Sequence, residues 1–314
     1  MSQSNTVIMP GETTRTRPQR TSYARQEALA GIVFAAPWLL NLLFLTLIPL
    51  GASLYFSFSE YQIVRAPVFW GTRNYVTLFT NDRLFIKSLW NTVYMVLLGV
   101  PLRMVLGMGI ALLMNTKVRG RALFRTMYYL PSQVSGVAFA MLWGFLLNPQ
   151  YGVVSNVIWS FGVRPPLWLA DPLWVKPSFV IMSLWGVGGT MIIWLAGLQS
   201  IPEVFYEAAE IDGAGRLRRF ASITLPLLSP TTFFVLVTGI IGTFQIFTQA
   251  YVLTAGGPAD ASLFYALYLY QQAFQFFKMG YASAMAWVLF IMIMALTLLQ
   301  LRLARSWVYY EAER

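Results

Sequence analysis

The side chains best suited to chemistry lie in one short charged segment between two apolar runs. Glu203, Glu207 and Glu210 are spaced so that a helix would carry all three carboxylates on one face. The two alanines that follow Glu207 are small enough for another surface to approach closely. This pattern suits a docking helix, and it also fits a solvated connector between two apolar helices. We expect a helix over 200–212 that ends at Gly213 in a left-handed turn.

Most catalytic side chains are missing from the chain. The 314 residues contain no Cys and no His, which removes thiol nucleophiles, imidazole bases, disulfides and Cys/His zinc sites. The phosphate-binding pattern G-x-x-x-x-G-K-[ST] does not occur either. We therefore expect no enzyme activity in the chain itself, no catalytic residue, no metal site and no bound cofactor.

The composition is that of a protein whose surface mostly meets lipid. Hydrophobic residues make up 57% of the chain and charged residues 11%, with a mean hydropathy of +0.60. A soluble domain carries about 25% charged residues. The net charge of +10 comes from residues at the ends of apolar runs, not from a basic face with interleaved aromatic side chains. We therefore expect a lipid bilayer around the chain and no nucleic acid partner.

Several charge-poor stretches reach the length of about 20 apolar residues that a helix needs to cross a bilayer. We predict an all-α integral membrane protein with six transmembrane helices near 29–57, 88–114, 124–147, 177–199, 226–253 and 280–303. The membrane domain is expected over 29–306, between a basic tail at 1–28 and a short tail at 307–314. The docking segment would form a loop over 200–226.

Lys and Arg predict the orientation, because short cytoplasmic loops carry an excess of both. The two tails and the loops near 117–125 and 216–219 hold fourteen of these residues, and the loops on the opposite side hold seven. Both termini and the docking loop are therefore expected in the cytoplasm. Residues 261–277 are rich in aromatic side chains and too short for a span, so we expect a helix at the outer membrane surface there.

The docking segment resembles the signature loop of permease subunits in ATP-binding-cassette (ABC) importers. The resemblance rests on the spacing of Glu207-Ala208-Ala209, Gly213 and Ile223-Thr224-Leu225-Pro226. Further segments resemble carbohydrate-uptake permeases related to the larger membrane subunit of the maltose transporter, namely 71–75, 91–92, 119–125, 130–131, 253–258 and 279–282. The resemblance covers roughly residues 30–303 and implies a compact six-helix form of the type I ABC importer fold.

The resemblance also implies roles for single residues. Those expected to couple the chain to a separate ATPase are Glu207, Ala208, Ala209, Asp212 and Gly213. Counting along the chain from the family motifs places sugar contacts at Ser132, Trp185, Gly186, Gly189, Gly239, Thr243 and Ile246.

Polar residues inside the apolar runs extend this predicted substrate path. Gln133, Thr190, Gln245 and Gln249 either line the path or form hydrogen bonds between helices, because an unpaired polar group in hydrocarbon is costly. Arg103 is the one charge away from the ends of a predicted span. It either faces a cavity in the protein or extends its side chain toward the membrane surface.

The sequence thus predicts the permease subunit of an ABC importer that moves a sugar or oligosaccharide across the cytoplasmic membrane of a prokaryote. The resemblance implies a second, non-identical six-helix permease, two ATPase subunits that hold ATP and Mg²⁺, and an extracytoplasmic solute-binding protein. An importer of a non-sugar solute is one alternative. A secondary transporter driven by an ion gradient is another, but it requires carboxylates within the membrane. All twelve Asp and Glu residues lie outside the predicted spans.

Overall fold

The computed structural model describes residues 20–116 and 119–309. The greater part of both predicted tails and Lys117 of the basic loop lie outside these residues. The chain divides into two compact units, Met1–Ser53 and Leu54–Arg314.

The first unit is helical and has almost no interior. It consists of α1 (Arg20–Asn41), the π-helical η1 (Leu42–Leu47) and the start of α2 (Ile48–Ser57). Phe34 is 87% exposed and Trp38 is 66% exposed. Together with the rest of α2 these elements form an apolar helix over Glu27–Ser57, which agrees with the span predicted over 29–57 and is long enough to cross a membrane.

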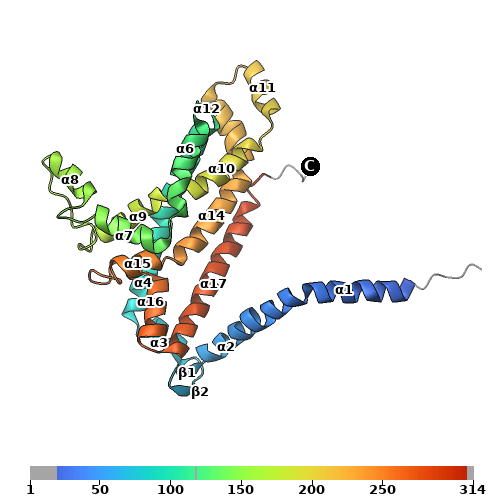
Figure 1. Cartoon of the computed structure of the whole chain (residues 1–314), viewed down its shortest axis with the longest axis vertical. Helices are drawn as coiled ribbons and strands as arrows, with labels where there is room; N and C mark the ends of the chain where they lie inside the picture. Colours follow the sequence, from blue (N-terminus) through green and yellow to red (C-terminus); the bar gives the residue numbers. More distant parts are fainter. Residues whose placement is uncertain (1–19, 117–118, 310–314) are drawn as a thin grey trace, which may run out of the picture. The chain divides into compact units, whose positions relative to one another are not determined.

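The second unit is a bundle of helices with one two-stranded ribbon. Its elements in chain order are β1 (Ser59–Gln62), β2 (Arg65–Phe69), α3 (Arg73–Thr80), α4 (Arg83–Tyr94), η2 (Met95–Gly99), α5 (Val100–Asn115), α6 (Arg121–Tyr129), η3 (Leu130–Gln133), α7 (Gly136–Leu146), α8 (Val153–Ser160), α9 (Val175–Trp185), α10 (Gly188–Gln199), α11 (Glu203–Ile211), α12 (Arg216–Arg219), η4 (Phe220–Thr224), α13 (Leu225–Leu227), α14 (Ser229–Phe244), α15 (Thr248–Leu253), α16 (Tyr265–Tyr270), η5 (Gln271–Gln275) and α17 (Met279–Ala304). Within this unit, the ribbon lies at one end and α11 and α12 lie at the other, with α14 and α17 running between them (Figure 1).

The ribbon corrects the prediction of an all-α protein, and the fold is mostly helical instead. Strands β1 and β2 pair in antiparallel fashion, with Ser59 opposite Phe69 and Glu60 opposite Val68. Aromatic and β-branched side chains in this stretch favour extended backbone. Strands this short give little periodic signal in a sequence dominated by apolar helices.

Three helical segments of this unit are long and apolar enough to cross a membrane, over Arg83–Asn115, Ser229–Leu253 and Met279–Ala304. They coincide with the second, fifth and sixth predicted spans. The fourth predicted span, 177–199, is a pair of helices, α9 and α10, that meet at a bend of 49°. In a membrane, backbone N–H and C=O groups form their hydrogen bonds within a helix. Where a helix is broken, nearby protein or water must supply the missing partners.

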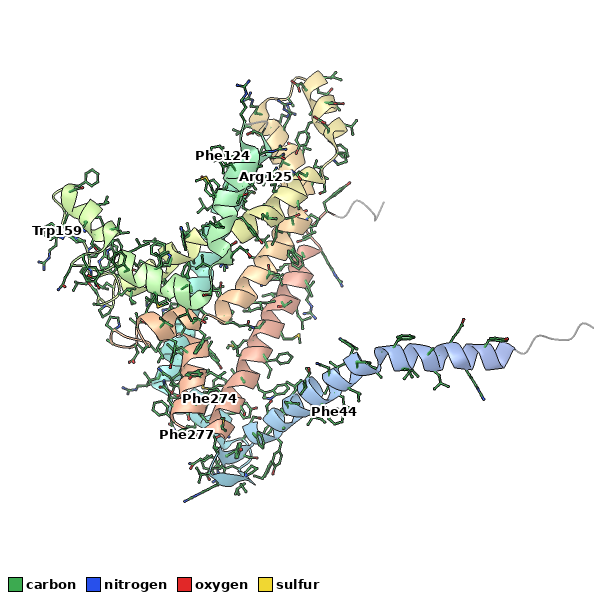
Figure 2. All side chains as sticks on the ribbon, viewed as in Figure 1. Phe44, Phe124, Arg125, Trp159, Phe274 and Phe277 are labelled. Atoms are coloured by element: carbon green, nitrogen blue, oxygen red, sulfur yellow. The ribbon has the colours of Figure 1, made fainter. Side chains whose placement is uncertain are left out.

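The third predicted span, 124–147, is two helices and not one. Helix α6 carries Phe124 and Arg125 (Figure 2), and the Arg125 guanidinium donates from Nη2 to the carbonyl oxygen of Met114 at 3.3 Å. Pro131 follows in η3 and lacks an N–H for the helical ladder. Ser135 then starts α7, where its Oγ accepts a hydrogen bond from the backbone N–H of Ala138 at 3.4 Å.

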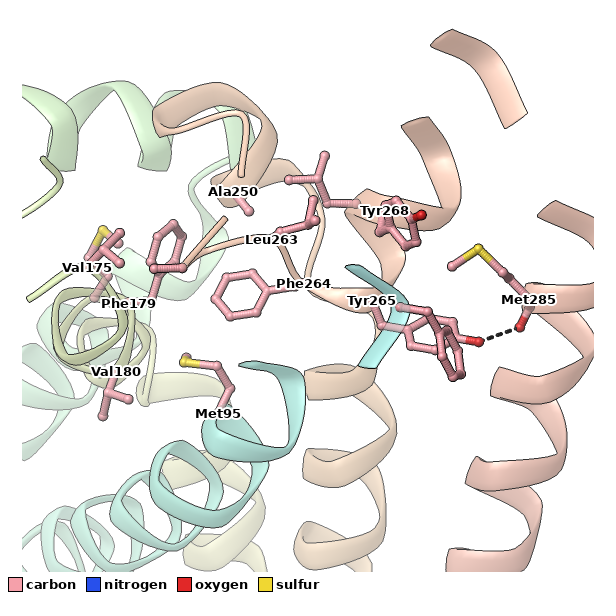
Figure 3. Close-up of a cluster of buried hydrophobic side chains, with 14 of the residues drawn as sticks. Met95, Val175, Phe179, Val180, Ala250, Leu263, Phe264, Tyr265, Tyr268 and Met285 are labelled. Carbon is pink, nitrogen blue, oxygen red and sulfur yellow. Dashed lines mark hydrogen bonds between the residues drawn. The ribbon is translucent and has the colours of Figure 1, made fainter. Parts of the chain in front are cut away.

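The main core of the second unit forms around α16. Phe264 and Tyr265 are fully buried, and the Tyr265 hydroxyl donates to the carbonyl oxygen of Met285 on α17 at 2.8 Å (Figure 3). The rings of Phe264 and Phe179 meet edge to face with centroids 5.2 Å apart. Burial of aromatic rings of this size accounts for much of the apolar stabilisation of a core.

The helix expected over 261–277 is shorter in the structure, where α16 is followed directly by η5. The first part of the segment lies in the core, where Leu267 is fully buried. Only its last turn opens outward, with Phe274 55% exposed and Phe277 53% exposed (Figure 2). The aromatic side chains in the first part of the segment are buried because they pack against neighbouring helices of the bundle.

The long loop before α16 is fastened to α4 by two polar side chains. The Asn91 amide donates from Nδ2 to the carbonyl oxygens of Asp260 at 2.9 Å and Leu263 at 3.0 Å. Thr92 Oγ1 accepts a hydrogen bond from the backbone N–H of Tyr265 at 2.9 Å. Buried polar side chains paired in this way hold α16 in register with the bundle.

A second core cluster joins α5, α10 and α14, and it contains the buried side chains of Trp194 and Met191. Helix α10 begins very close to the end of α6. A Cβ at Gly188 would overlap the carbonyl oxygen of Tyr128 and lie 2.7 Å from the Cα of Tyr129. Glycine is therefore required where the two helices meet.

Candidate functional site

The docking helix predicted over 200–212 is α11, which spans Glu203–Ile211. Pro202 precedes its first turn and contributes no side-chain cap. The Ser200 hydroxyl donates to the carbonyl oxygen of Gly197 at 2.8 Å, so it belongs to the end of α10. The helix is therefore shorter than expected, because the backbone of Pro202 is extended, with a ψ of 133°, and the helix begins only after it.

The left-handed stop expected at Gly213 is confirmed. Its φ is +73°. Its N–H donates to the carbonyl oxygen of Glu210 at 3.0 Å, and the N–H of Ala214 donates to the carbonyl oxygen of Ala209 at 2.8 Å. These two bonds define a Schellman motif, which satisfies the last carbonyls of α11 and turns the chain toward α12.

One side of α11 is open to the surroundings. Among the residues predicted to couple the chain to an ATPase, the exposed ones are Glu207, Ala208, Asp212 and Gly213, and Ala209 is half-buried. Val204 is 61% exposed and Ile211 is 88% exposed. Carboxylates and apolar side chains therefore share an accessible surface at the end of the unit opposite the ribbon (Figure 1).

The other side of α11 is tied to the segment that leads into α14. The hydroxyl of Tyr206 and Oγ1 of Thr224 form a hydrogen bond of 3.0 Å. Arg219 Nη1 lies 3.1 Å from Glu210 Oε2 in an ion pair. The Glu210 carboxylate is 73% exposed, so this pair contributes little free energy and the Tyr206 contact is the firmer tie.

A cavity of about 410 Å³ lies inside the bundle where its helices are interrupted. Backbone from the end of α9, from 245–247 between α14 and α15, and from η2 at the start of α5 surrounds it. The residues of the predicted substrate path that line this cavity are Gly186, Thr243, Gln245, Ile246 and Gln249. Amide and hydroxyl groups thus meet in one partly open cavity.

A smaller cavity of about 270 Å³ lies between α5, α10 and α14. It is lined by two further residues of the predicted path, Thr190 and Gly239. Gly239 packs closely there, because a Cβ would lie 3.2 Å from Val100 Cγ1 and 3.7 Å from Arg103 Nη2.

Four residues of the predicted path line neither cavity. Ser132 and Gly189 adjoin each other, since a Cβ at Gly189 would lie 3.9 Å from the Ser132 side chain. Gln133 donates from Nε2 to Ser132 Oγ at 3.3 Å. Trp185 packs edge to face against Trp143, with ring centroids 6.1 Å apart, so it is part of an aromatic cluster at the edge of the core.

Apart from Arg103, the other residues that line the larger cavity were not singled out by the sequence. The remaining lining residues are Met95, Gly99, Arg103, Phe139, Phe179, Met182, Ser183, Gly242, Phe247 and Thr248. Thr248 lies between two predicted glutamines, and Ser183 precedes Gly186 by three residues in the last turn of α9. Their spacing from the predicted residues could have indicated both Thr248 and Ser183. The apolar lining residues, in contrast, resemble ordinary core residues.

Arg103 lies on α5 and lines both cavities. Its Nη2 donates a long hydrogen bond of 3.4 Å to Thr243 Oγ1, and that hydroxyl donates to the carbonyl oxygen of Gly239 at 2.7 Å. Of the two possibilities left open by the sequence, the structure therefore favours a cavity-facing guanidinium.

Apolar helices of membrane-crossing length, an interior cavity at their interruptions and an exposed loop helix define a membrane transport subunit. The family model described as the binding-protein-dependent transport system inner membrane component matches residues 103–308. The chain belongs to this family.

Named relatives and a solved structure agree with this assignment. The chain is 41% identical over 293 residues to the probable ABC transporter permease protein YesP of Bacillus subtilis, which covers 92% of this chain and 94% of the relative. It is 36% identical over 294 residues to the lactose transport system permease protein LacF of Rhizobium radiobacter, at 91% and 98% coverage. The fold matches a chain of a bacterial ABC transporter involved in the import of the acidic polysaccharide alginate, with a TM-score of 0.79, 25% identity and coverage of 91% and 98%.

These findings confirm the resemblance drawn from the sequence. The chain is the permease subunit of an ABC transporter, an inner membrane component with the type I ABC importer fold. Subunits of this family work with a binding protein, as the family description states.

Proposed function

We propose that this subunit carries a sugar or oligosaccharide across the cytoplasmic membrane, through the cavity between α5, α9 and α14. The cavity volume of about 410 Å³ falls in the range of about 300–1,000 Å³ typical of small-molecule sites. Gln245, Gln249 and Thr248 offer amide and hydroxyl groups to sugar hydroxyls, and Phe139 and Phe247 offer ring faces. Relatives named for lactose and alginate transport support a sugar as the cargo.

The observation that carries the proposal is the connection between α11 and this cavity. Helix α11 is exposed on one side and is bonded through Tyr206 to Thr224, shortly before α14. Helix α14 ends at Phe244, and Thr243 in its last turn and Gln245 just after it line the cavity. A protein that pushes on α11 would therefore move a helix that lines the substrate path.

We infer that the partner on α11 is an ATPase subunit, which holds ATP and Mg²⁺. Glu207 and Asp212 would make charged contacts with it, Ala208 and Ala209 would allow close approach, and Gly213 would set the turn. This chain itself acts as a permease and not as an enzyme. Two ATPases require two such helices, so a second and non-identical six-helix permease would complete the membrane domain, and an extracytoplasmic solute-binding protein would deliver the sugar.

The proposed topology has six membrane segments, with both termini and α11 in the cytoplasm. Four long helices and the bent pair α9–α10 supply five of them, and α6, η3 and α7 together supply the remaining one. The excess of Lys and Arg on the α11 side supports this orientation. Residues 1–28 and 307–314 would be cytoplasmic tails of a membrane domain over 29–306.

The test is ATP-dependent sugar uptake by vesicles that hold the complete complex, comparing the native chain with Glu207→Lys. We expect the variant to lose both uptake and bound ATPase, because the reversed charge repels the partner surface that the carboxylate recognises. Glu60→Lys is the matched control, since Glu60 is an exposed carboxylate in β1 at the opposite end of the unit.

Uptake that continues without ATPase, or that follows an ion gradient, would refute the proposal. Equal losses in Glu207→Lys and Glu60→Lys would show that charge reversal alone is damaging. ATP-driven uptake of a solute other than a sugar would agree with the proposed coupling to an ATPase but would refute a sugar as the transported solute.

A further inference from the structure

The charge of Arg103 is the feature of the cavity that a path for neutral sugars does not explain. A guanidinium presents five N–H donors in a rigid fork. In this structure it makes one long hydrogen bond, to the Thr243 hydroxyl at 3.4 Å. Most of its donors are thus available to a group in one of the two cavities that it lines.

The protein supplies no counter-charge to this guanidinium within the residues that the structure describes. The two ion pairs found there join Lys87 to Asp260 and Arg219 to Glu210. The lining residues of both cavities include no Asp and no Glu. A lone charge within a span costs at least about 2.5 kcal/mol on insertion scales, so a role for the charge itself is expected.

The neighbours of Arg103 suit a sugar that carries an acid. Gln245, Gln249 and Thr248 line the same cavity and are neutral hydrogen-bonding groups. A guanidinium binds carboxylate, sulfonate or phosphate oxygens through two parallel N–H donors, and it binds them more strongly in surroundings of low dielectric constant.

We propose that Arg103 binds an anionic substituent of the transported sugar, so that this permease accepts acidic sugars, with a uronic acid carboxylate as the simplest case. The inference rests on the proposed sugar transport. It adds a chemical class of cargo and a residue that selects it. The anion would neutralise the charge of Arg103 while the amides hold the sugar hydroxyls.

The experiment uses proteoliposomes with the complete complex and two probes, digalacturonate and its carboxyl-reduced neutral counterpart. Native protein is compared with Arg103→Gln and Arg103→Lys. We expect kcat/KM for digalacturonate uptake to fall about 10- to 100-fold in Arg103→Gln, the loss expected for a charge-assisted hydrogen bond. The kcat/KM of Arg103→Lys should lie between those of the native protein and Arg103→Gln. Lysine keeps the positive charge but lacks the paired N–H donors of the guanidinium.

The neutral probe and an outside charge serve as controls. Any uptake of the neutral disaccharide should change less than about 3-fold in Arg103→Gln, which also verifies that the variant folds and assembles. Arg305→Gln removes an exposed positive charge at the end of α17, outside both cavities, and should leave the preference between the two probes unchanged.

Four outcomes would overturn the inference. An equal loss of uptake for both probes in Arg103→Gln, or failure of that complex to assemble, would show that Arg103 has a structural role. It could, for example, pair with a carboxylate of the second permease. Native transport of the neutral probe alone would refute the acidic cargo while leaving sugar transport intact. A native complex that hydrolyses ATP but takes up neither disaccharide nor any other sugar would defeat the proposed function and this inference with it.

Discussion

Gly188→Ala is the substitution for which the structure gives the sharpest contrast. A Cβ at this position would overlap the carbonyl oxygen of Tyr128 and lie 2.7 Å from the Cα of Tyr129. Ordinary contacts of a Cβ begin near 3.4 Å, so α10 and α6 would have to separate by about 0.7 Å or more. The atoms in the way belong to the backbone, and no side-chain rotation can relieve the overlap.

Gly189→Ala is the matched control, since it changes the next residue of the same helical turn. The nearest atoms to its Cβ are those of the Ser132 side chain at 3.9 Å. Both substitutions gain about 1 kcal/mol of helix propensity. Overpacking costs about 1–3 kcal/mol, so Gly188→Ala should be less stable than Gly189→Ala by about 2 kcal/mol.

The assay is the thermal unfolding of the purified permease complex in detergent, followed by loss of the intact species on size-exclusion chromatography. A difference of about 2 kcal/mol corresponds, for a chain of 314 residues, to a melting temperature about 3 °C lower for Gly188→Ala than for Gly189→Ala. Equal melting temperatures, or a more stable Gly188→Ala, would show that α10 does not begin against the Tyr128 carbonyl.

Three further substitutions test other contacts of the site and the bundle. Gly213→Ala forces a left-handed backbone on a residue with a Cβ at a cost of about 1–2 kcal/mol, so the ATPase should co-purify less well, whereas Gly215→Ala, at a φ of −66°, should retain it. Asp82→Asn removes the charged acceptor of two tyrosine hydroxyls, so we expect the free energy of unfolding to fall by about 1.5–3 kcal/mol. An unchanged melting temperature would contradict this expectation. Tyr206→Phe deletes the 3.0 Å hydrogen bond to Thr224, worth about 1 kcal/mol, and should weaken sugar-stimulated ATP hydrolysis while the ATPase remains bound. Full stimulation in that variant would mean that α11 is held by other contacts.

The long helices could be predicted from the sequence because apolar length is a direct requirement of the bilayer. Their interruptions could not. Pro131 was visible within the predicted span 124–147, but a proline within a span can also kink a helix without dividing it. The ribbon was missed because strands as short as Ser59–Gln62 have little pattern of their own.

The candidate site was predictable where its residues share one segment. Thr243, Gln245 and Gln249 lie within a few residues of each other, so a motif and a polar pattern both led to the same cavity wall. Trp185 lies outside that wall, and its ring packs edge to face against Trp143. Arg103 belongs to a distant helix, and only the folded bundle brings it to Thr243.

The break between α14 and α15 has a consequence for how such permeases diversify. Residues 245–249 supply side chains to the cavity, while Thr243 and Phe244 before them and Ala250 after them are buried in the bundle. Exchanges at Gln245 or Gln249 would therefore alter what the wall presents without disturbing the neighbours that secure it. A short stretch of this kind lets a lineage acquire new cargoes by few mutations while its scaffold stays the same.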